Sequence, residues 1–156
     1  MALVPALVLK AGLPQVAGAG DTISTAVSSV STYAMTAAAA LVKGNAVYSS
    51  SSTAALAKGD ASATSRCIGL VADATIANAA SGNIATSGPL TIADWTAITG
   101  ALPLVAGAPY FVSDATAGLL TVTAPTASGH FTHQIGYALT TTTMMIEVSP
   151  TVWAIP

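Results

Sequence analysis

The sequence predicts an all-β protein: a small β-barrel or β-sandwich of short antiparallel strands with an extended N-terminal arm. Apolar runs of Val, Ile and Leu are embedded in Thr, Ser and Gly, a mixture that suits pleated strands. From Leu41 onward, Gly, Asn, Asp and Pro separate these runs at intervals of about 8–12 residues, which is the spacing of a sandwich or barrel. The segment before Leu41 does not follow this pattern.

Residues 1–40 are predicted to form the arm. An apolar stretch at Leu7, Val8 and Leu9 is followed by a glycine-rich hinge and then by a Ser/Thr/Ala tract. Asp21 is a good N-cap and favours a short helix after it, although Ser and Thr are mediocre helix formers. We expect the apolar stretch to contact another subunit or a partner protein, by adding a strand to the edge of the partner's sheet.

Residues 41–149 are predicted to form the β domain, and residues 150–156 a C-terminal tail. Eight runs are candidate strands because turn residues bound each of them. They are Ala46–Ser49, Arg66–Ala72, Ile84–Ser87, Leu90–Ile92, Pro109–Ser113, Leu119–Thr123, Phe131–Leu139 and Thr143–Val148. In the last run apolar and more polar residues alternate, which indicates a strand buried on one face.

An internal repeat runs through the β domain. The segment LVKGNAVYS at 41–49 leads to IGL at 68–70, and LVAGAPYFVS at 104–113 leads to IGY at 135–137. The two halves are therefore candidates for related β units around a pseudo-two-fold axis. Glycine inside a strand often marks a bulge, so Gly69 and Gly136 are predicted to lie where strands bend to close a barrel.

Charge is scarce. Only 6% of the residues are charged, against about 25% in typical soluble domains, and 53% are hydrophobic. A neutral surface gives little protection against association, which indicates a subunit largely covered by neighbours. The four Lys and Arg residues are scattered singly, so direct binding to nucleic acid is not expected.

Every apolar run is interrupted by Ser, Thr, Gly or Pro, so no transmembrane segment and no membrane partner are expected. The single cysteine, Cys67, permits no intrachain disulfide. The chain starts without the basic residues of a secretory signal, and we expect it to be made in the cytoplasm.

Candidate catalytic or metal-binding residues are few. His130 and His133 would lie on opposite faces of one strand, which favours structural or interface roles over joint metal binding. The alternative is a trimer axis where one histidine from each of three subunits meets. The five aspartates stand in turn-like contexts, and no serine lies in a G-x-S-x-G motif. We therefore expect no catalytic residues, no metal and no cofactor, and hence no enzyme.

Two tryptophans are candidate interface residues, because tryptophan is enriched among binding hot spots. Trp153 lies in the apolar C-terminal tail, and Trp95 lies between a predicted strand and the turn at Gly100. For Trp95 the sequence leaves two alternatives open, an interface with another protein and the core.

The segments LVKGNAVYSSS, CIGLVAD, LPLVAGAPYFVSDATAGLLTVTAP and HFTHQIGYALTTTTMMIEV resemble the β domain of phage capsid decoration, head-fibre and some tail-associated proteins. The resemblance covers Leu41 to Val148. Its positions are turn and strand signals: Gly107, Phe111, Ser113, Asp114, Gly118, Leu120, Thr121, Pro125, Ile135, Gly136, Ala138 and Leu139. The opening LVLKAGLPQVAGAGDTI also resembles the start of phage fibre and head-fibre proteins.

This resemblance implies a structural virion protein: a decoration or cement subunit, commonly a homotrimer, on the outside of the head, bridging major capsid proteins. A dimer remains an alternative to the trimer. The first rival function is a fibre or tail-associated module that binds a receptor, although only Asp94-Trp95 offers the aromatic and polar neighbours expected of a glycan reader. A small hydrolase is the second rival, and no catalytic constellation supports it.

Overall fold

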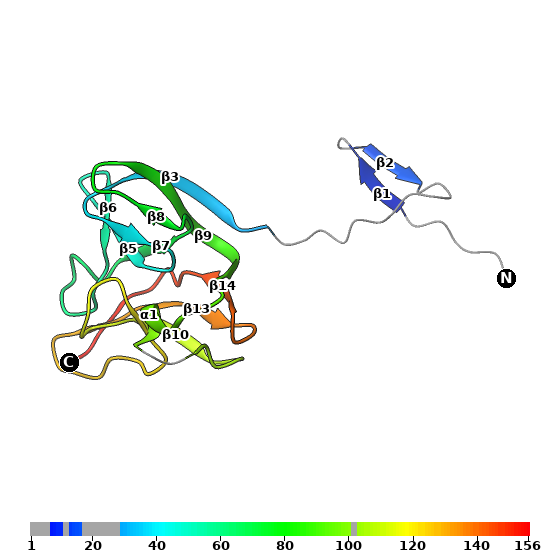
Figure 1. Ribbon diagram of the computed structural model, residues 1–156. Helices are drawn as coiled ribbons and strands as arrows, with labels where there is room; N and C mark the ends of the chain where they lie inside the picture. Colours follow the sequence, from blue (N-terminus) through cyan, green and yellow to red (C-terminus); the bar gives the residue numbers. More distant parts are fainter. Residues whose placement is uncertain (1–6, 11–12, 17–28, 101–102) are drawn as a thin grey trace.

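The computed structural model describes residues 7–10, 13–16, 29–100 and 103–156, and of the first two segments it describes the backbone alone. The chain is all-β, as the sequence predicts, and the described residues contain one short helix, α1 (Thr96–Thr99). Of the two predicted architectures, the barrel is the one found. A closed barrel continues into an open sheet (Figure 1).

Five strands close the barrel in the order β9-β3-β6-β5-β7, because β7 pairs back onto β9. They are β3 (Ser31–Ala37), β5 (Ala46–Ser50), β6 (Thr53–Leu56), β7 (Cys67–Val71) and β9 (Ser81–Thr91). β3 and β6 run parallel, whereas the other neighbours run antiparallel. Alternate residues of these strands form one apolar cluster: Met35, Ala37, Val47, Ala54, Val71 and Ile84, joined by Leu41 and Ile76.

Strand β9 belongs to both parts of the structure. Its first half pairs with β3 and β7, and its second half pairs with β14. From there the open sheet continues through β14 (Thr143–Glu147), β13 (Gln134–Ala138), β10 (Pro109–Val112) and β11 (Leu120–Thr121). The sequence predicts two strands where β9 forms one. Gly88, with φ +94°, and Pro89 lie within the strand, and β14 stays paired past both of them.

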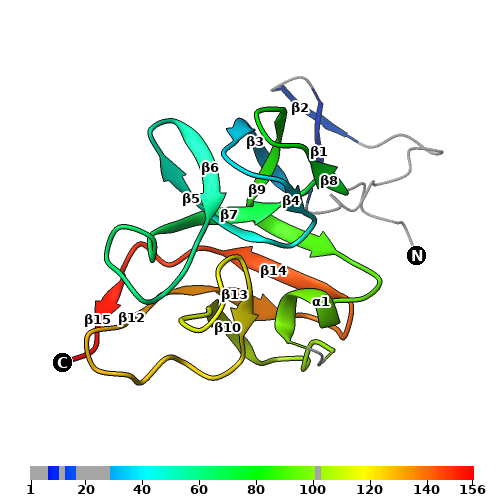
Figure 2. The same ribbon diagram turned by 60° about the vertical axis from the view of Figure 1, so that its left-hand side comes forward.

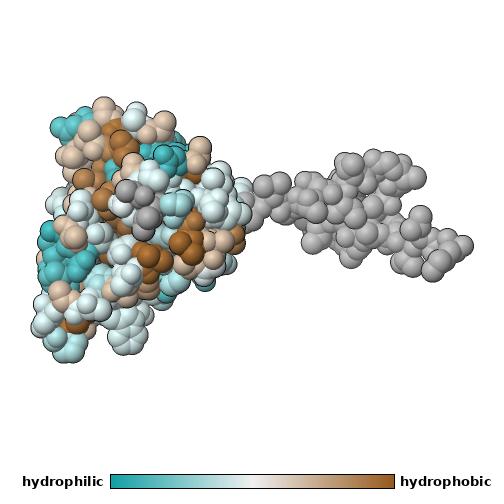
Figure 3. Space-filling model, turned by 60° about the horizontal axis from the view of Figure 1, so that its bottom comes forward, coloured by the Kyte–Doolittle hydropathy of each residue, from teal (hydrophilic) through white to brown (hydrophobic). Residues whose placement is uncertain are grey.

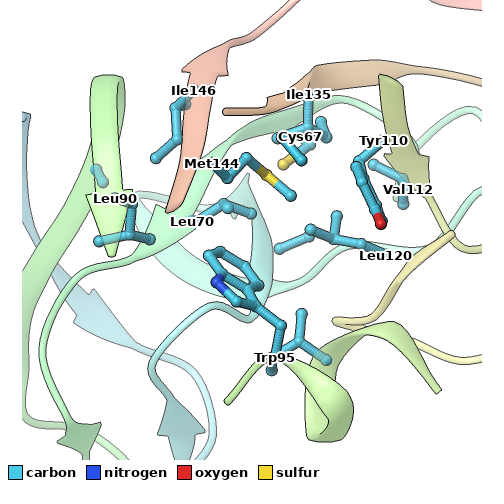
Figure 4. Packing of buried hydrophobic residues seen from close by; sticks show 14 of the residues in the cluster. Cys67, Leu70, Leu90, Trp95, Tyr110, Val112, Leu120, Ile135, Met144 and Ile146 are labelled. Atoms are coloured by element: carbon cyan, nitrogen blue, oxygen red, sulfur yellow. The ribbon is translucent and has the colours of Figure 1, made fainter. Parts of the chain in front are cut away.

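The larger core lies between the outer wall of the barrel and the open sheet (Figure 2). Leu70 from the barrel, Tyr110 and Met144 from the open sheet, and Trp95 next to α1 point toward one another there (Figure 4). Three short strand pairs complete the described structure. They are β4 (Leu41–Val42) with β8 (Thr75–Ile76), β12 (Phe131–Thr132) with β15 (Trp153–Ala154), and β1 (Leu7–Lys10) with β2 (Leu13–Val16).

The internal repeat in the sequence is also a repeat of strand pairing. In the first copy, β5 pairs with β7 so that Val47 faces Gly69. The register then shifts by one residue, so that Tyr48 faces Cys67 and Ile68 is the extra residue of a bulge.

The second copy contains the same arrangement. β10 pairs with β13 so that Tyr110 faces Gly136, and after an identical shift Phe111 faces Gln134, which leaves Ile135 as the extra residue. Each bulge therefore lies directly before the glycine that the sequence associates with it. The first copy closes into the barrel, whereas the second remains an open sheet.

The predicted arm and tail differ from the structure in their extent. β3 lies inside the predicted arm, at residues 1–40, but it pairs with β9 and β6 as part of the barrel. The short helix predicted after Asp21 lies outside the described residues. The C-terminal tail is attached to the body, because β15 pairs with β12 and the N–H of Ile155 donates a 2.9 Å hydrogen bond to the carbonyl oxygen of His130.

Candidate functional site

The two histidines have separate partners, one on the surface and one in the interior. His130 places Nδ1 2.9 Å from Oδ2 of Asp114 at a half-exposed position. His133 is only 3% exposed. They therefore do not share a site. Among the described residues, no group of three or more His, Cys, Asp and Glu side chains is placed to hold a metal ion.

His133 connects three segments of the chain. Its Nε2 lies 2.8 Å from the carbonyl oxygen of Ser149, and its Nδ1 lies 3.1 Å from the backbone nitrogen of Cys67 and 2.8 Å from the carbonyl oxygen of Ser65. The N–H of Cys67 donates to Nδ1, and Nε2 donates to the carbonyl of Ser149, because a carbonyl oxygen only accepts. The ring thereby ties β13 to the start of β7 and to the segment that follows β14, which is a structural role.

Cys67 is buried, and its Sγ lies 3.2 Å from the carbonyl oxygen of Gly69. Burial raises the pKa of this thiol to about 12, because the thiolate would lose its hydration. The nucleophilic thiolate is therefore essentially absent near neutral pH. Cys67 belongs to the core and is not a reactive site.

Four of the ionisable groups gather around Gly59. Lys58 and Asp60 form an ion pair of 2.6 Å, and Asp114 and His130 lie in contact on the other side. Gly59 ties these loops together, since its N–H donates to the carbonyl of Ser113 and its carbonyl accepts from the N–H of Phe131. The hydrogen bond from Lys58 is the largest cause of the lowered pKa of Asp60.

Two further aspartates satisfy local backbone amides, as the sequence predicts for turn residues. Asp94 accepts a 2.8 Å hydrogen bond from the N–H of Thr96, which is the largest cause of its lowered pKa. Asp73 accepts a 2.8 Å hydrogen bond from the N–H of Asn83. Most carboxylates near the turns thus have structural partners inside the chain.

Two hollows open on the described surface. The smaller, of about 70 Å³, is lined by Ser62, Ser65, Arg66, Phe131, Val152 and Ala154. The larger, of about 350 Å³, is lined by Gln134, Glu147, Val148, Ser149 and Pro150. Ser149 and Glu147 both line the larger hollow, but the Ser149 hydroxyl donates a 3.2 Å hydrogen bond to the carbonyl oxygen of Thr151 and is not directed to the carboxylate.

The described surface is instead marked by exposed apolar side chains among neutral polar ones (Figure 3). Six large apolar side chains are exposed: Tyr33, Val42, Val105, Val122, Leu139 and Trp153. No helix among the described residues is long and apolar enough to cross a membrane.

The structure separates the two tryptophans that the sequence selects as interface candidates. Trp153 is 68% exposed on β15, so it is accessible to a partner. Trp95 is 1% exposed, and its indole N–H donates a 2.9 Å hydrogen bond to the carbonyl of Thr142. Trp95 is therefore a core residue and not an interface residue, because a buried ring offers no surface to a partner. Leu7, Val8 and Leu9 form most of β1, and their side chains lie outside the described structure.

The sequence analysis misses the exposed first half of β3. Ser31, Thr32, Tyr33 and Ala34 are all exposed, and the Tyr33 side chain is 66% exposed. The available signal was the alternation of Tyr33, Met35 and Ala37 with the small residues Ala34 and Thr36, which has the period of a strand. The surrounding Ser/Thr/Ala tract concealed it.

Comparison with family models, with curated proteins and with solved structures found no match to this chain.

Proposed function

We propose that this protein is a structural subunit of a virus particle, a decoration or cement protein on the outside of a phage head. It binds there as a homo-oligomer, a trimer in the favoured arrangement, and stabilises the contacts between major capsid proteins. It acts by mechanical cohesion and needs no cofactor, nucleic acid or membrane. It is made in the cytoplasm of the host and ends on the capsid surface.

The observation that carries the proposal is the neutral, partly apolar surface of a well-packed body. The ion pairs around Gly59 and the turn contacts of Asp73 and Asp94 occupy much of the charge that the chain has. The remaining surface offers neutral side chains and exposed apolar ones such as Val105 and Leu139. A free monomer with this surface would be prone to associate, whereas a subunit covered by capsid proteins and by its own copies is protected.

The candidate chemistry supports the same proposal. The buried histidine and the buried cysteine both serve the fold, and the Ser149 hydroxyl in the larger hollow is hydrogen-bonded to the backbone of Thr151. What a partner can use is shape, neutral hydrogen-bonding groups and apolar side chains. These are the means by which structural subunits adhere.

The test is binding of the purified protein to expanded heads of the phage that encodes it, measured as the mass that sediments with the heads. We expect saturable binding, and we expect Val8→Asp to weaken it severalfold without unfolding the β domain, because β1 would have to bury a charge. Thr123→Asp, in an exposed turn, is the control. Failure of the unmodified protein to bind heads would refute the proposal.

A receptor-binding module of a fibre or tail is the second candidate. The observation that favours it is Trp153, whose ring is exposed on β15, between Val152 and Ala154, two residues that line the smaller hollow. An exposed aromatic ring suits the apolar face of a sugar. Binding to host cells that Trp153→Ala abolishes, together with no binding to heads, would favour this candidate.

A further inference from the structure

The first half of β3 has one edge without a strand partner. β3 pairs with β9 along most of its length but with β6 only at Thr36 and Ala37. Asn83 of β9 directs its carbonyl toward β7, where it accepts a 2.9 Å hydrogen bond from the N–H of Ala72. Because Ala34 stands opposite Asn83 in an antiparallel pair, its own N–H and C=O point away from β9.

Thr32 has the same orientation, because backbone groups alternate along a strand and its partner Ala85 also faces β7. The N–H and C=O groups of Thr32 and Ala34 thus form an outward edge that no described residue pairs with. Proteins usually protect such an edge with a charge or a proline. This edge has neither, and the exposed ring of Tyr33 lies within it.

The N-terminal hairpin supplies a complementary edge. β1 and β2 pair with each other and with no other described strand, and a two-stranded hairpin is marginally stable alone. Pro14 faces Leu9 and has no N–H to donate, so these two residues form a non-hydrogen-bonded pair. Leu9, and by alternation Leu7, therefore direct their N–H and C=O groups to the outer edge of β1.

The two edges of the hairpin are not equivalent. On the outer edge of β2, Pro14 removes a donor, which hinders the addition of another strand. On the outer edge of β1, the donors and acceptors of Leu7 and Leu9 are intact. Strand addition is therefore directed to β1.

We propose that β1 of one copy adds to the free half of β3 in a second copy, so that copies of the chain exchange their N-terminal hairpins. Residues 17–30, which connect Val16 to Ser31, span roughly 45–50 Å when extended, at about 3.3–3.6 Å per residue. That reach suffices for a neighbouring copy. Each copy gives one edge and accepts one, so every free edge is paired when the exchange closes into a ring, as in a cyclic dimer or trimer.

The first test compares two proline substitutions by light scattering of the purified full chain. Leu9→Pro removes an N–H from the outer edge of β1, so we expect the oligomer to dissociate to single chains of 15.2 kDa. Val16→Pro removes an N–H from the edge that Pro14 already hinders, and we expect no change in mass. Val16 stands opposite Leu7 in a non-hydrogen-bonded pair, so both substitutions are equally compatible with the hairpin.

The second test identifies the partner strand by disulfide formation. Chains carrying Leu7→Cys, Val8→Cys or Leu9→Cys are each mixed with chains carrying Tyr33→Cys and oxidised; the buried Cys67 does not compete. We expect at least one mixture to form linked pairs of unlike chains. A monomeric wild type, or a disulfide that forms only within one chain carrying both cysteines, overturns the proposal. Head binding is measured separately, so exchange can fail while the cement function stands.

Discussion

Gly69 and Gly136 stand at equivalent positions in the two halves of the molecule, and each lies against a carbonyl group of the next strand. A Cβ atom on Gly69 would overlap the carbonyl oxygen of Ala85, and one on Gly136 would overlap that of Met145. Ala85 and Met145 are themselves equivalent in the strand pairing that follows each bulge. Both halves therefore need a residue without a side chain at this point.

Replacing either glycine by alanine is expected to destabilise the protein by about 2–3 kcal/mol, because backbone atoms must move to admit the methyl group. Urea unfolding measures the loss. Gly129→Ala is the matched control: its φ is +79°, but its Cβ would meet no atom within 4 Å, so we expect a loss of only about 1 kcal/mol from backbone strain. Equal losses at all three positions would contradict the close approach.

His133→Leu is expected to lower the free energy of unfolding by about 2–4 kcal/mol. The substitution removes the acceptor of the buried N–H of Cys67 and the donor to the partly buried carbonyl of Ser149. His130→Leu serves as the comparison, because its contact with Asp114 is half-exposed and contributes about 1 kcal/mol or less. Chemical denaturation of both variants measures the difference, and equal effects would refute the structural role of His133.

The two tryptophans are expected to respond in opposite ways. Trp95→Ala should destabilise the fold by about 3–5 kcal/mol, since it empties a core site and removes one of the two hydrogen bonds that the carbonyl of Thr142 accepts. Trp153→Ala should change stability by no more than about 0.5 kcal/mol, because the ring is largely exposed. Thermal unfolding monitored by circular dichroism distinguishes them. A large loss from Trp153→Ala would show that this ring supports the fold.

The protein is expected to lose stability at alkaline pH because of the buried thiol of Cys67. Its thiol has a pKa near 9.0 when exposed and of about 12 in the folded chain. Because the pKa is raised in the folded state, the protonated thiol contributes its full stability below about pH 9. As the pH rises toward 12 this contribution is lost, and the free energy of unfolding falls by up to about 1.4 kcal/mol per pH unit. Urea unfolding between pH 8 and pH 11 should show this slope in the wild type and a shallower one in Cys67→Ala. Parallel curves would refute the prediction.

The sequence predicts the architecture because turn residues and strand periodicity are local signals. The bulges at Ile68 and Ile135 follow from the glycines after them, and the repeat of LVKG and LVAG indicates the two halves. β9 is mispredicted as two strands because Gly88-Pro89 has turn composition. The pairing of β14 with β9 past both residues is seen only in the folded structure, because it joins segments that are distant in the sequence.

The candidate site is less predictable, because exposure depends on contacts between distant segments. The composition around Trp95 suits a core and an interface equally well. The carbonyl that accepts the hydrogen bond from its indole N–H belongs to Thr142, which lies 47 residues away. The free edge of β3 arises where β6 ends its pairing at Thr36. No local pattern in the Ser/Thr/Ala tract specifies that point.

The sharing of β9 between barrel and sheet makes the two halves thermodynamically inseparable. The strand contributes 11 residues, and its hydrogen bonds to β3, β7 and β14 would all be disturbed if either half unfolded. The described body should therefore unfold in a single cooperative step, with the amides of β9 exchanging with solvent only on global opening. A subunit with this property resists pulling as one unit, so a load applied to either half would be borne by both.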